Sequence, residues 1–210
     1  MNNEINSKLN SFIRKYYKNL LIKGLVYSIL LLLIFFLVLN LIEYFGYNAP
    51  IIRTIIFYAY LLLALTIFCL LVVKPLFKIF SIGKTLSYKQ AAKIIGNHFP
   101  EIQDKLLNLL QLQDISSNSN SELLKAAIAQ KTLLLSPIPF TKAIDTTKTK
   151  KYAKVLLMVL CLIILIGVFF PKILSEPTFR YLNHNTFYEK PAPFAFYVKD
   201  APLRAIQQAD

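Results

Sequence analysis

Few residues in this chain have the type and spacing that catalysis or metal binding requires. The histidines, His98 and His184, lie on either side of the last long apolar block, and Glu101 and Asp104 form an i,i+3 carboxylate pair. Such a pair can hold a cation, but charge at a helix start and solvation explain it more simply. Phosphate-binding and hydrolase motifs such as G-x-x-x-x-G-K and G-x-S-x-G are absent from the sequence. We therefore predict no catalytic, cofactor-binding or metal-binding residue, and no enzyme activity.

Three long apolar blocks dominate the rest of the sequence. Hydrophobic residues make up 56% of the chain and charged residues 17%, against about 45–50% and about 25% in soluble domains. The blocks cover residues 25–42, 55–73 and 155–170 and hold no charged residue. About 20 helical residues cross the hydrocarbon core of a bilayer. We predict three transmembrane helices, because a chain of 210 residues is too short to bury three helices that lack a polar face.

The charges between the blocks predict the orientation of these helices. Residues 1–23 carry a net charge of +4 and residues 74–154 a net charge of +8, whereas 43–53 are neutral and 155–210 carry +1. Basic residues near the ends of membrane spans are retained in the cytoplasm. Both strongly basic segments are then cytoplasmic, and both nearly neutral segments are periplasmic. The basic excess also predicts attraction to anionic phospholipid headgroups. No nucleic-acid partner is expected, since no motif for one is present.

The predicted fold class is an all-α membrane protein of the bacterial inner membrane, with three transmembrane helices and both a cytoplasmic and a periplasmic part. The predicted segments are a cytoplasmic N-terminal segment (1–21), a first span (22–43), a short periplasmic turn (44–53), a second span (54–75), a basic cytoplasmic helical segment (76–152), a third span (153–173) and a periplasmic tail (174–210).

The segment between the second and third spans has the pattern of amphipathic helices. Ser87 and Gln90 have the spacing of a capping box, Pro100 suits the first turn of a second helix, and Ser121 suits the N-cap of a third. The sequence Ser136-Pro137 predicts the end of that third helix. Each helix is too short to be stable alone. The helices therefore form a small bundle, or lie in the headgroup plane of the membrane.

The tail differs from the rest of the chain. Residues 176–193 are rich in proline, asparagine and aromatic residues, and residues 194–198 have the pattern of a short strand. A lone strand is not stable without partners. The tail therefore predicts the beginning of a larger extracytoplasmic β region.

Three stretches of the sequence form distinctive motifs: Ile94-Ile95-Gly96-Asn97-His98-Phe99-Pro100-Glu101-Ile102-Gln103-Asp104-Lys105-Leu106-Leu107-Asn108, Ser136-Pro137-Ile138-Pro139-Phe140 and Tyr188-Glu189-Lys190-Pro191-Ala192-Pro193-Phe194. They resemble an uncharacterised family of Bacteroidota envelope proteins. Members of the family are much longer chains, with an N-terminal membrane module and a large extracytoplasmic region. The resemblance implies that this chain is such a module, and it assigns no catalytic residue.

These features lead to one expected function and two alternatives. The expected function is a non-enzymatic inner-membrane anchor or scaffold that holds a periplasmic region and presents a basic helical segment in the cytoplasm. The first alternative is a subunit of a membrane complex for transport, secretion or energy transduction, with partner subunits or further copies of the chain packed on its spans. The second is the membrane part of a receptor or enzyme whose active domain lies elsewhere.

Overall fold

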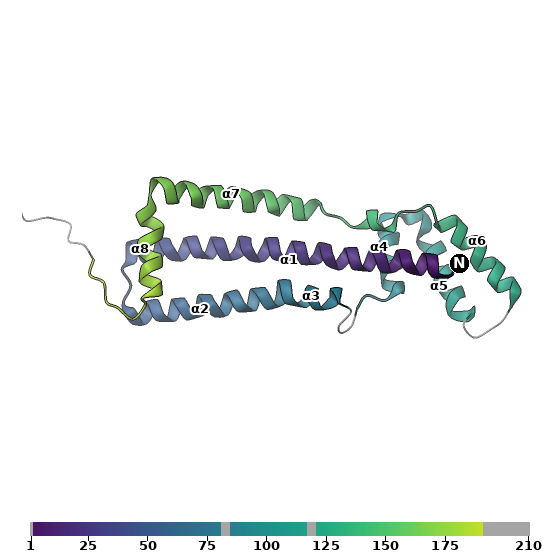
Figure 1. The fold of residues 1–210 in the computed structure, drawn as a ribbon, viewed down its shortest axis with the longest axis horizontal. Coiled ribbons are helices and arrows are strands. Elements are labelled where there is room, and N and C mark those ends of the chain that lie inside the picture. Colours follow the sequence, from purple (N-terminus) through teal and green to yellow (C-terminus); the bar gives the residue numbers. More distant parts are fainter. Residues whose placement is uncertain (1, 81–84, 117–120, 191–210) are drawn as a thin grey trace, which may run out of the picture.

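The computed structural model describes residues 2–80, 85–116 and 121–190, which form an elongated helical molecule (Figure 1). Helices make up 86% of these residues, and no strand occurs among them. Three long helical segments run side by side, a small helical bundle lies at one end, and a short helix crosses the other end (Figure 1). The elements are α1 (Asn2–Gly46), α2 (Pro50–Phe68), the π-helix η1 (Cys69–Val73), α3 (Lys74–Ile79), α4 (Tyr88–His98), α5 (Pro100–Ser116), α6 (Glu122–Leu135), the 3₁₀-helix η2 (Phe140–Ala143), α7 (Thr147–Phe169) and α8 (Pro171–Leu182).

The three predicted spans are present as long apolar helices. Residues Glu4–Gly46, Pro50–Ile79 and Thr147–Phe169 are each long and apolar enough to cross a bilayer. Large apolar side chains cover their outer surfaces, whereas the polar residues Ser28 and Asn40 are buried between the helices. Polar groups turned inward and apolar groups turned outward suit a lipid environment. The prediction of an all-α, multi-pass membrane protein is confirmed at this level.

Helix α1 extends far beyond the first apolar block. It is one helix of 45 residues, so the boundary predicted between residues 21 and 22 is not a break in the helix. Ile5, Leu9 and Phe12 recur along one face of its N-terminal part, and all three are fully buried. The N-terminal segment is therefore a structural part of the molecule that contributes to a hydrophobic core.

That core belongs to a bundle formed by α4, α5 and α6 together with the N-terminal part of α1. The predicted capping box opens α4, since Ser87 and Gln90 each bond the other's backbone N–H. Helix α5 begins at Pro100 and α6 ends at Leu135, both as predicted. The buried core comprises Ile5, Leu9, Phe12, Ala91, Ala92, Ile95, Ile102, Leu106, Leu109, Leu110, Ile128, Leu135, Phe140 and Ala143. The apolar faces of these helices therefore pack against one another, so the helices form a small bundle, the first of the two arrangements that the sequence allowed.

A π-helical segment interrupts the second span near its end. Pro75 has no N–H to donate to the Leu71 carbonyl four residues earlier. The backbone takes the wider i to i+5 spacing here, with the Lys74 N–H donating to the Cys69 carbonyl. The Leu71 carbonyl lies against Gly24 of α1, where a Cβ atom would come within 1.9 Å of its oxygen. Only glycine permits this close approach of α1 and η1.

The basic end of α7 lies beside the corresponding part of α1. Asp145 accepts hydrogen bonds from the Thr147 N–H and hydroxyl, at 2.8 and 2.5 Å, and these bonds lower the pKa of the Asp145 carboxyl. Further along the chain, Tyr152 of α7 packs edge-on against Tyr27 of α1, with ring centroids 4.4 Å apart. Aromatic residues at this position are typical of a membrane–water interface.

The tail differs from the expectation over residues 171–182, which form α8. Pro171 occupies the first turn of α8, where its missing N–H costs nothing. Pro177 lies inside the helix, and side-chain bonds from residues after it hold α8 to α1. The strand expected at residues 194–198 lies outside the described residues.

Candidate functional site

The best-organised polar cluster lies where α1 turns into α2. Glu43 near the end of α1 and Arg53 in the first turn of α2 are both 0% exposed, and they form an ion pair in which the Arg53 Nη2 lies 2.9 Å from Oε1 of Glu43. The Arg53 Nε donates to the same oxygen at 3.1 Å. The turn between them contains Tyr47, whose φ of 47° is in the left-handed region. The pair therefore closes a tight helical hairpin.

The remaining polar atoms of this pair are also satisfied. Asn48 in the turn donates to the other carboxylate oxygen of Glu43 at 3.0 Å, while its own carbonyl accepts from Arg53 at 2.9 Å. The Arg53 Nη1 donates to the carbonyl of Thr186, beyond α8, at 2.8 Å. A buried ion pair is retained only where its desolvation is offset by such additional bonds. Arg53 thus joins the hairpin to the segment that follows α8.

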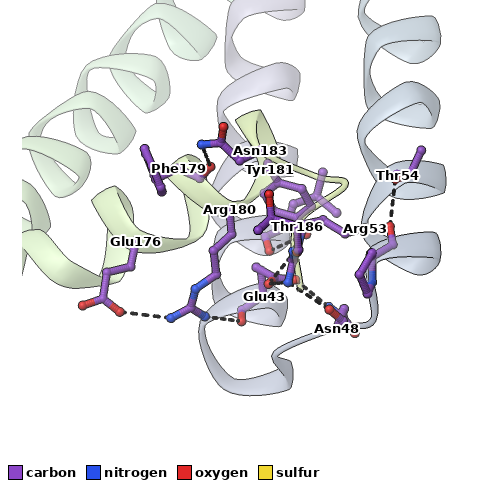
Figure 2. Close-up of polar contacts among 12 residues, drawn as sticks. Glu43, Asn48, Arg53, Thr54, Glu176, Phe179, Arg180, Tyr181, Asn183 and Thr186 are labelled. Atoms are coloured by element: carbon purple, nitrogen blue, oxygen red, sulfur yellow. Dashed lines mark hydrogen bonds and ion pairs between the residues drawn. The ribbon is translucent and has the colours of Figure 1, made fainter. Parts of the chain in front are cut away.

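Arg180 of α8 brings a second arginine to the cluster, as Figure 2 shows. Its guanidinium donates to the backbone carbonyl of Glu43 at 3.5 Å and to the carboxylate of Glu176 at 3.1 Å. It also lies over the ring of Tyr47, 3.9 Å from the centroid, and Tyr188 lies within 6 Å of both arginines. The cluster therefore contains two carboxylates and two guanidinium groups, whose charges balance. The rings of Tyr47 and Tyr188 lie against the guanidinium groups.

Two further bonds hold α8 across α1. The Thr178 hydroxyl donates to the side-chain oxygen of Asn40 at 2.9 Å, and the Tyr181 hydroxyl donates to the carbonyl of Leu39 at 3.1 Å. Burial, followed by the nearby Glu43 carboxylate, raises the pKa of Tyr181 to about 12. The phenol therefore remains a hydrogen-bond donor throughout the physiological pH range.

The residues that the sequence offered for chemistry are not brought together. His184 follows α8, where its Nδ1 lies 3.0 Å from the Thr54 hydroxyl and its ring stacks on Phe57. His98 is exposed at the end of α4, at the opposite end of the molecule (Figure 1). Glu101 and Asp104 are both exposed on α5. Among the described residues, no three His, Cys, Asp or Glu side chains are grouped as metal ligands.

The cluster is arranged to hold helices together. Each carboxylate and guanidinium in it has a partner within the protein. Glu43, Asn48 and Arg53 fix the hairpin, and Arg180 with Thr178 and Tyr181 fixes α8 across it. The cluster therefore positions α8 and the residues that follow it against the α1–α2 hairpin.

Sequence reasoning treated these residues as isolated features. Glu43 and Arg53 entered only as the two opposite charges of the neutral segment 43–53. One signal was present: an acid at the end of one span and a base at the start of the next can pair across a short turn. Nothing local in the sequence indicates that Arg180 joins them, because α8 follows much later in the chain.

Comparison with known proteins supplies no family assignment. No protein-family model, curated protein or solved structure matches the chain. The resemblance to Bacteroidota envelope proteins therefore stays a prediction.

Proposed function

We propose that this protein is a non-enzymatic anchor and scaffold of the bacterial inner membrane. Its three spans fix it in the bilayer, with the helical bundle in the cytoplasm and α8 at the periplasmic face. In this role the protein holds the segment after α8 at one face of the membrane in a fixed relation to the bundle at the other face.

The observation that carries the proposal is the continuity of α1. The same 45-residue helix supplies Ile5, Leu9 and Phe12 to the bundle core and Glu43 to the buried cluster at its other end. A continuous hydrogen-bonded helix transmits position and rotation along its length better than a loop does. Both ends are packed, so the two faces of the membrane are connected by a stiff element.

The proposed orientation is supported by where the basic residues gather. Lys23 of α1, Lys74 and Lys78 of α3, and Lys148 of α7 lie at the bundle end of the spans, where they line adjoining grooves. The cluster at the other end balances in charge. This asymmetry agrees with retention of basic span ends in the cytoplasm.

Labelling of single cysteines in the full chain tests the topology. In a background with Cys69→Ala and Cys161→Ala, we expect Glu189→Cys to react with a membrane-impermeant maleimide in intact spheroplasts. Glu122→Cys should react only after lysis. Both residues are exposed, so poor reactivity reports the membrane rather than burial. Reaction of Glu122→Cys in intact spheroplasts would overturn the proposed orientation.

A role as a subunit of a membrane complex is favoured by one surface of the bundle. Leu123, Leu133 and Leu134 of α6 are 84%, 64% and 61% exposed, and large apolar side chains left exposed on a bundle helix suit contact with another protein. Purification in mild detergent tests this alternative, because a subunit should retain a stoichiometric partner and a self-contained anchor should not.

A further inference from the structure

We propose that a groove between α1 and the η1–α3 segment is a binding site for one anionic phospholipid. The site rests on the membrane embedding proposed above. It goes beyond a general attraction between basic residues and the bilayer, because it names one groove, three lysines and one ligand molecule.

The groove combines a cationic rim with an apolar wall. It has a volume of about 380 Å³ and is lined by Lys23, Lys74 and Lys78 together with Tyr27 and apolar residues. Those apolar residues are Leu20, Leu70, Leu71 and Pro75, with Gly24 between the two sides. A phosphodiester needs cationic donors and its acyl chains need apolar contact, and this groove offers both on adjoining surfaces.

The position of the lysines matches the depth of a lipid headgroup. Lys23 comes two residues before the first apolar block, and Lys74 directly follows the second. Tyr27 lies one turn after Lys23, near the start of the block, and packs on Tyr152 of α7, as interfacial aromatic residues do. Basic pockets between membrane helices at the cytoplasmic side are suited to anionic headgroups.

The backbone shapes the groove at this place. The Leu71 carbonyl rests on Gly24, so the widened π-turn is pressed against α1 while Lys74 and Lys78 project from the following helix. π-helical turns are frequent at functional sites. The contact between Gly24 and the Leu71 carbonyl therefore fixes the spacing of the two sides of the groove.

The three lysines are available to a ligand. Lys74 and Lys78 are exposed and Lys23 is half-exposed, and none of them forms an ion pair within the part of the chain that the structure describes. The ammonium groups of Lys23 and Lys78 lie over the rings of Tyr27 and Tyr17, at 5.4 and 5.9 Å from the centroids. These contacts orient the lysines and leave their positive charge unneutralised.

Lipid binding to the purified full chain tests the site. Phosphatidylglycerol or phosphatidylcholine is added to the protein in an uncharged detergent, and native mass spectrometry counts bound lipid. We expect one phosphatidylglycerol molecule to bind in preference to phosphatidylcholine. The variant Lys23→Gln/Lys74→Gln/Lys78→Gln should bind it at least about tenfold more weakly, since each basic residue contributes to the attraction. The corresponding triple Lys→Arg variant should bind as the unchanged protein does.

A matched control separates this site from bulk charge. Lys93→Gln/Lys105→Gln/Lys125→Gln removes the same charge from exposed positions of the bundle, outside the groove, and should leave binding within about twofold. Equal loss in both triple variants, no loss in the groove variant, or equal binding of the two lipids would each overturn the proposal.

Carbonate extraction of membranes distinguishes failure of the site from failure of the proposed function. A protein that stays in the membrane fraction but binds phosphatidylglycerol without the groove lysines lacks the site and keeps the anchor role. A protein released by carbonate contradicts the anchor itself.

Discussion

At the scale of single residues, the buried ion pair of Glu43 and Arg53 holds together the end of the molecule where α8 crosses the α1–α2 hairpin. Both side chains are removed from water, and their cost is offset only because every oxygen and nitrogen has a partner. Removing one member leaves the other charge buried and unpaired. The pair therefore matters more through what its loss exposes than through the attraction it supplies.

We expect Arg53→Ala to destabilise the protein by about 3–5 kcal/mol, because it leaves the Glu43 carboxylate without its cation. The double variant Glu43→Ala/Arg53→Ala should lose less than the two single variants combined. Reversible unfolding in mixed micelles measures these free energies. Glu176→Ala is the control: Glu176 is 42% exposed in its pair with Arg180, and such a pair contributes about 1 kcal/mol or less. Equal losses for Arg53→Ala and Glu176→Ala would contradict the role given to the buried pair.

Tyr181 should titrate apart from the other tyrosines. Its pKa is raised to about 12, whereas an unfolded tyrosine titrates near about 10. The folded state favours the neutral phenol, so this contribution to stability is complete below about pH 10 and is lost as the pH rises from there toward 12. The difference between the near-ultraviolet phenolate titrations of the wild type and Tyr181→Phe isolates this group. A difference curve centred near pH 10 would show that Tyr181 is not held as described.

At the scale of elements, α1 is the helix against which the rest of the molecule is assembled. It contacts the π-turn at Gly24, α7 at Tyr27 and α8 at Asn40, and it enters the bundle core at its N-terminal end. Two of these contacts can be tested with single substitutions.

Gly24→Ala should displace η1 from α1. A Cβ at Gly24 would lie 1.9 Å from the Leu71 oxygen and 2.8 Å from its carbonyl carbon, both backbone atoms, so the helices must separate. We expect a destabilisation of about 1–3 kcal/mol, seen as a lower unfolding temperature in detergent. Gly167→Ala in α7 is the matched control, because its nearest neighbour is the Leu174 Cδ1 at 3.9 Å. An unchanged unfolding temperature for Gly24→Ala would show that the close contact is absent.

Leu9→Ala should loosen the bundle although it lies outside α4, α5 and α6. Leu9 is fully buried in their core, and truncating a buried leucine costs about 2–5 kcal/mol. Limited proteolysis between residues 85 and 146 should become faster. Leu133→Ala removes the same atoms from a side chain that is 64% exposed, and it should leave the proteolysis rate unchanged. Equal rates for both variants would mean that α1 does not complete the core.

At the scale of the whole molecule, the basic residues at the span ends are distributed unevenly along the long axis. The chain carries a net +13, and the basic span ends gather at the bundle end. Replacing Lys148, Lys150, Lys151 and Lys154 with Gln should loosen the orientation of the third span, because the charge nearest a span end governs its retention. Labelling of Glu189→Cys in spheroplasts would then become partial. The same change at Lys93, Lys105, Lys125 and Lys131, which lie in the bundle, is the control, and partial labelling there alone would contradict the argument.

Features that depend on residues close together in the sequence could be predicted, and features that depend on residues far apart could not. The capping box at Ser87 and the helix start at Pro100 depend on neighbours three or four residues away, and both predictions are confirmed. The docking of α8 depends on Asn40, Glu43 and Arg180, which are far apart in the chain, and no local pattern indicates it. The helical spacing of Ile5, Leu9 and Phe12 could have predicted a buried helix face. The basic residues of this segment were interpreted only as a sign of its cytoplasmic location.

The unbroken course of α1 has a geometric consequence for the length of the chain. Each residue turns an α-helix by about 100°, so one residue inserted near Gly24 would turn the bundle to a different side of the molecule and move it by about 1.5 Å. Seven inserted residues would bring it back to within about 20° of its original facing. Seven inserted residues should therefore disturb the facing of the bundle less than one inserted residue does, although they move it by about 10 Å along the helix axis. The length of α1 therefore fixes two quantities: the distance between the bundle and α8, and the rotation of the bundle about the helix axis relative to α8.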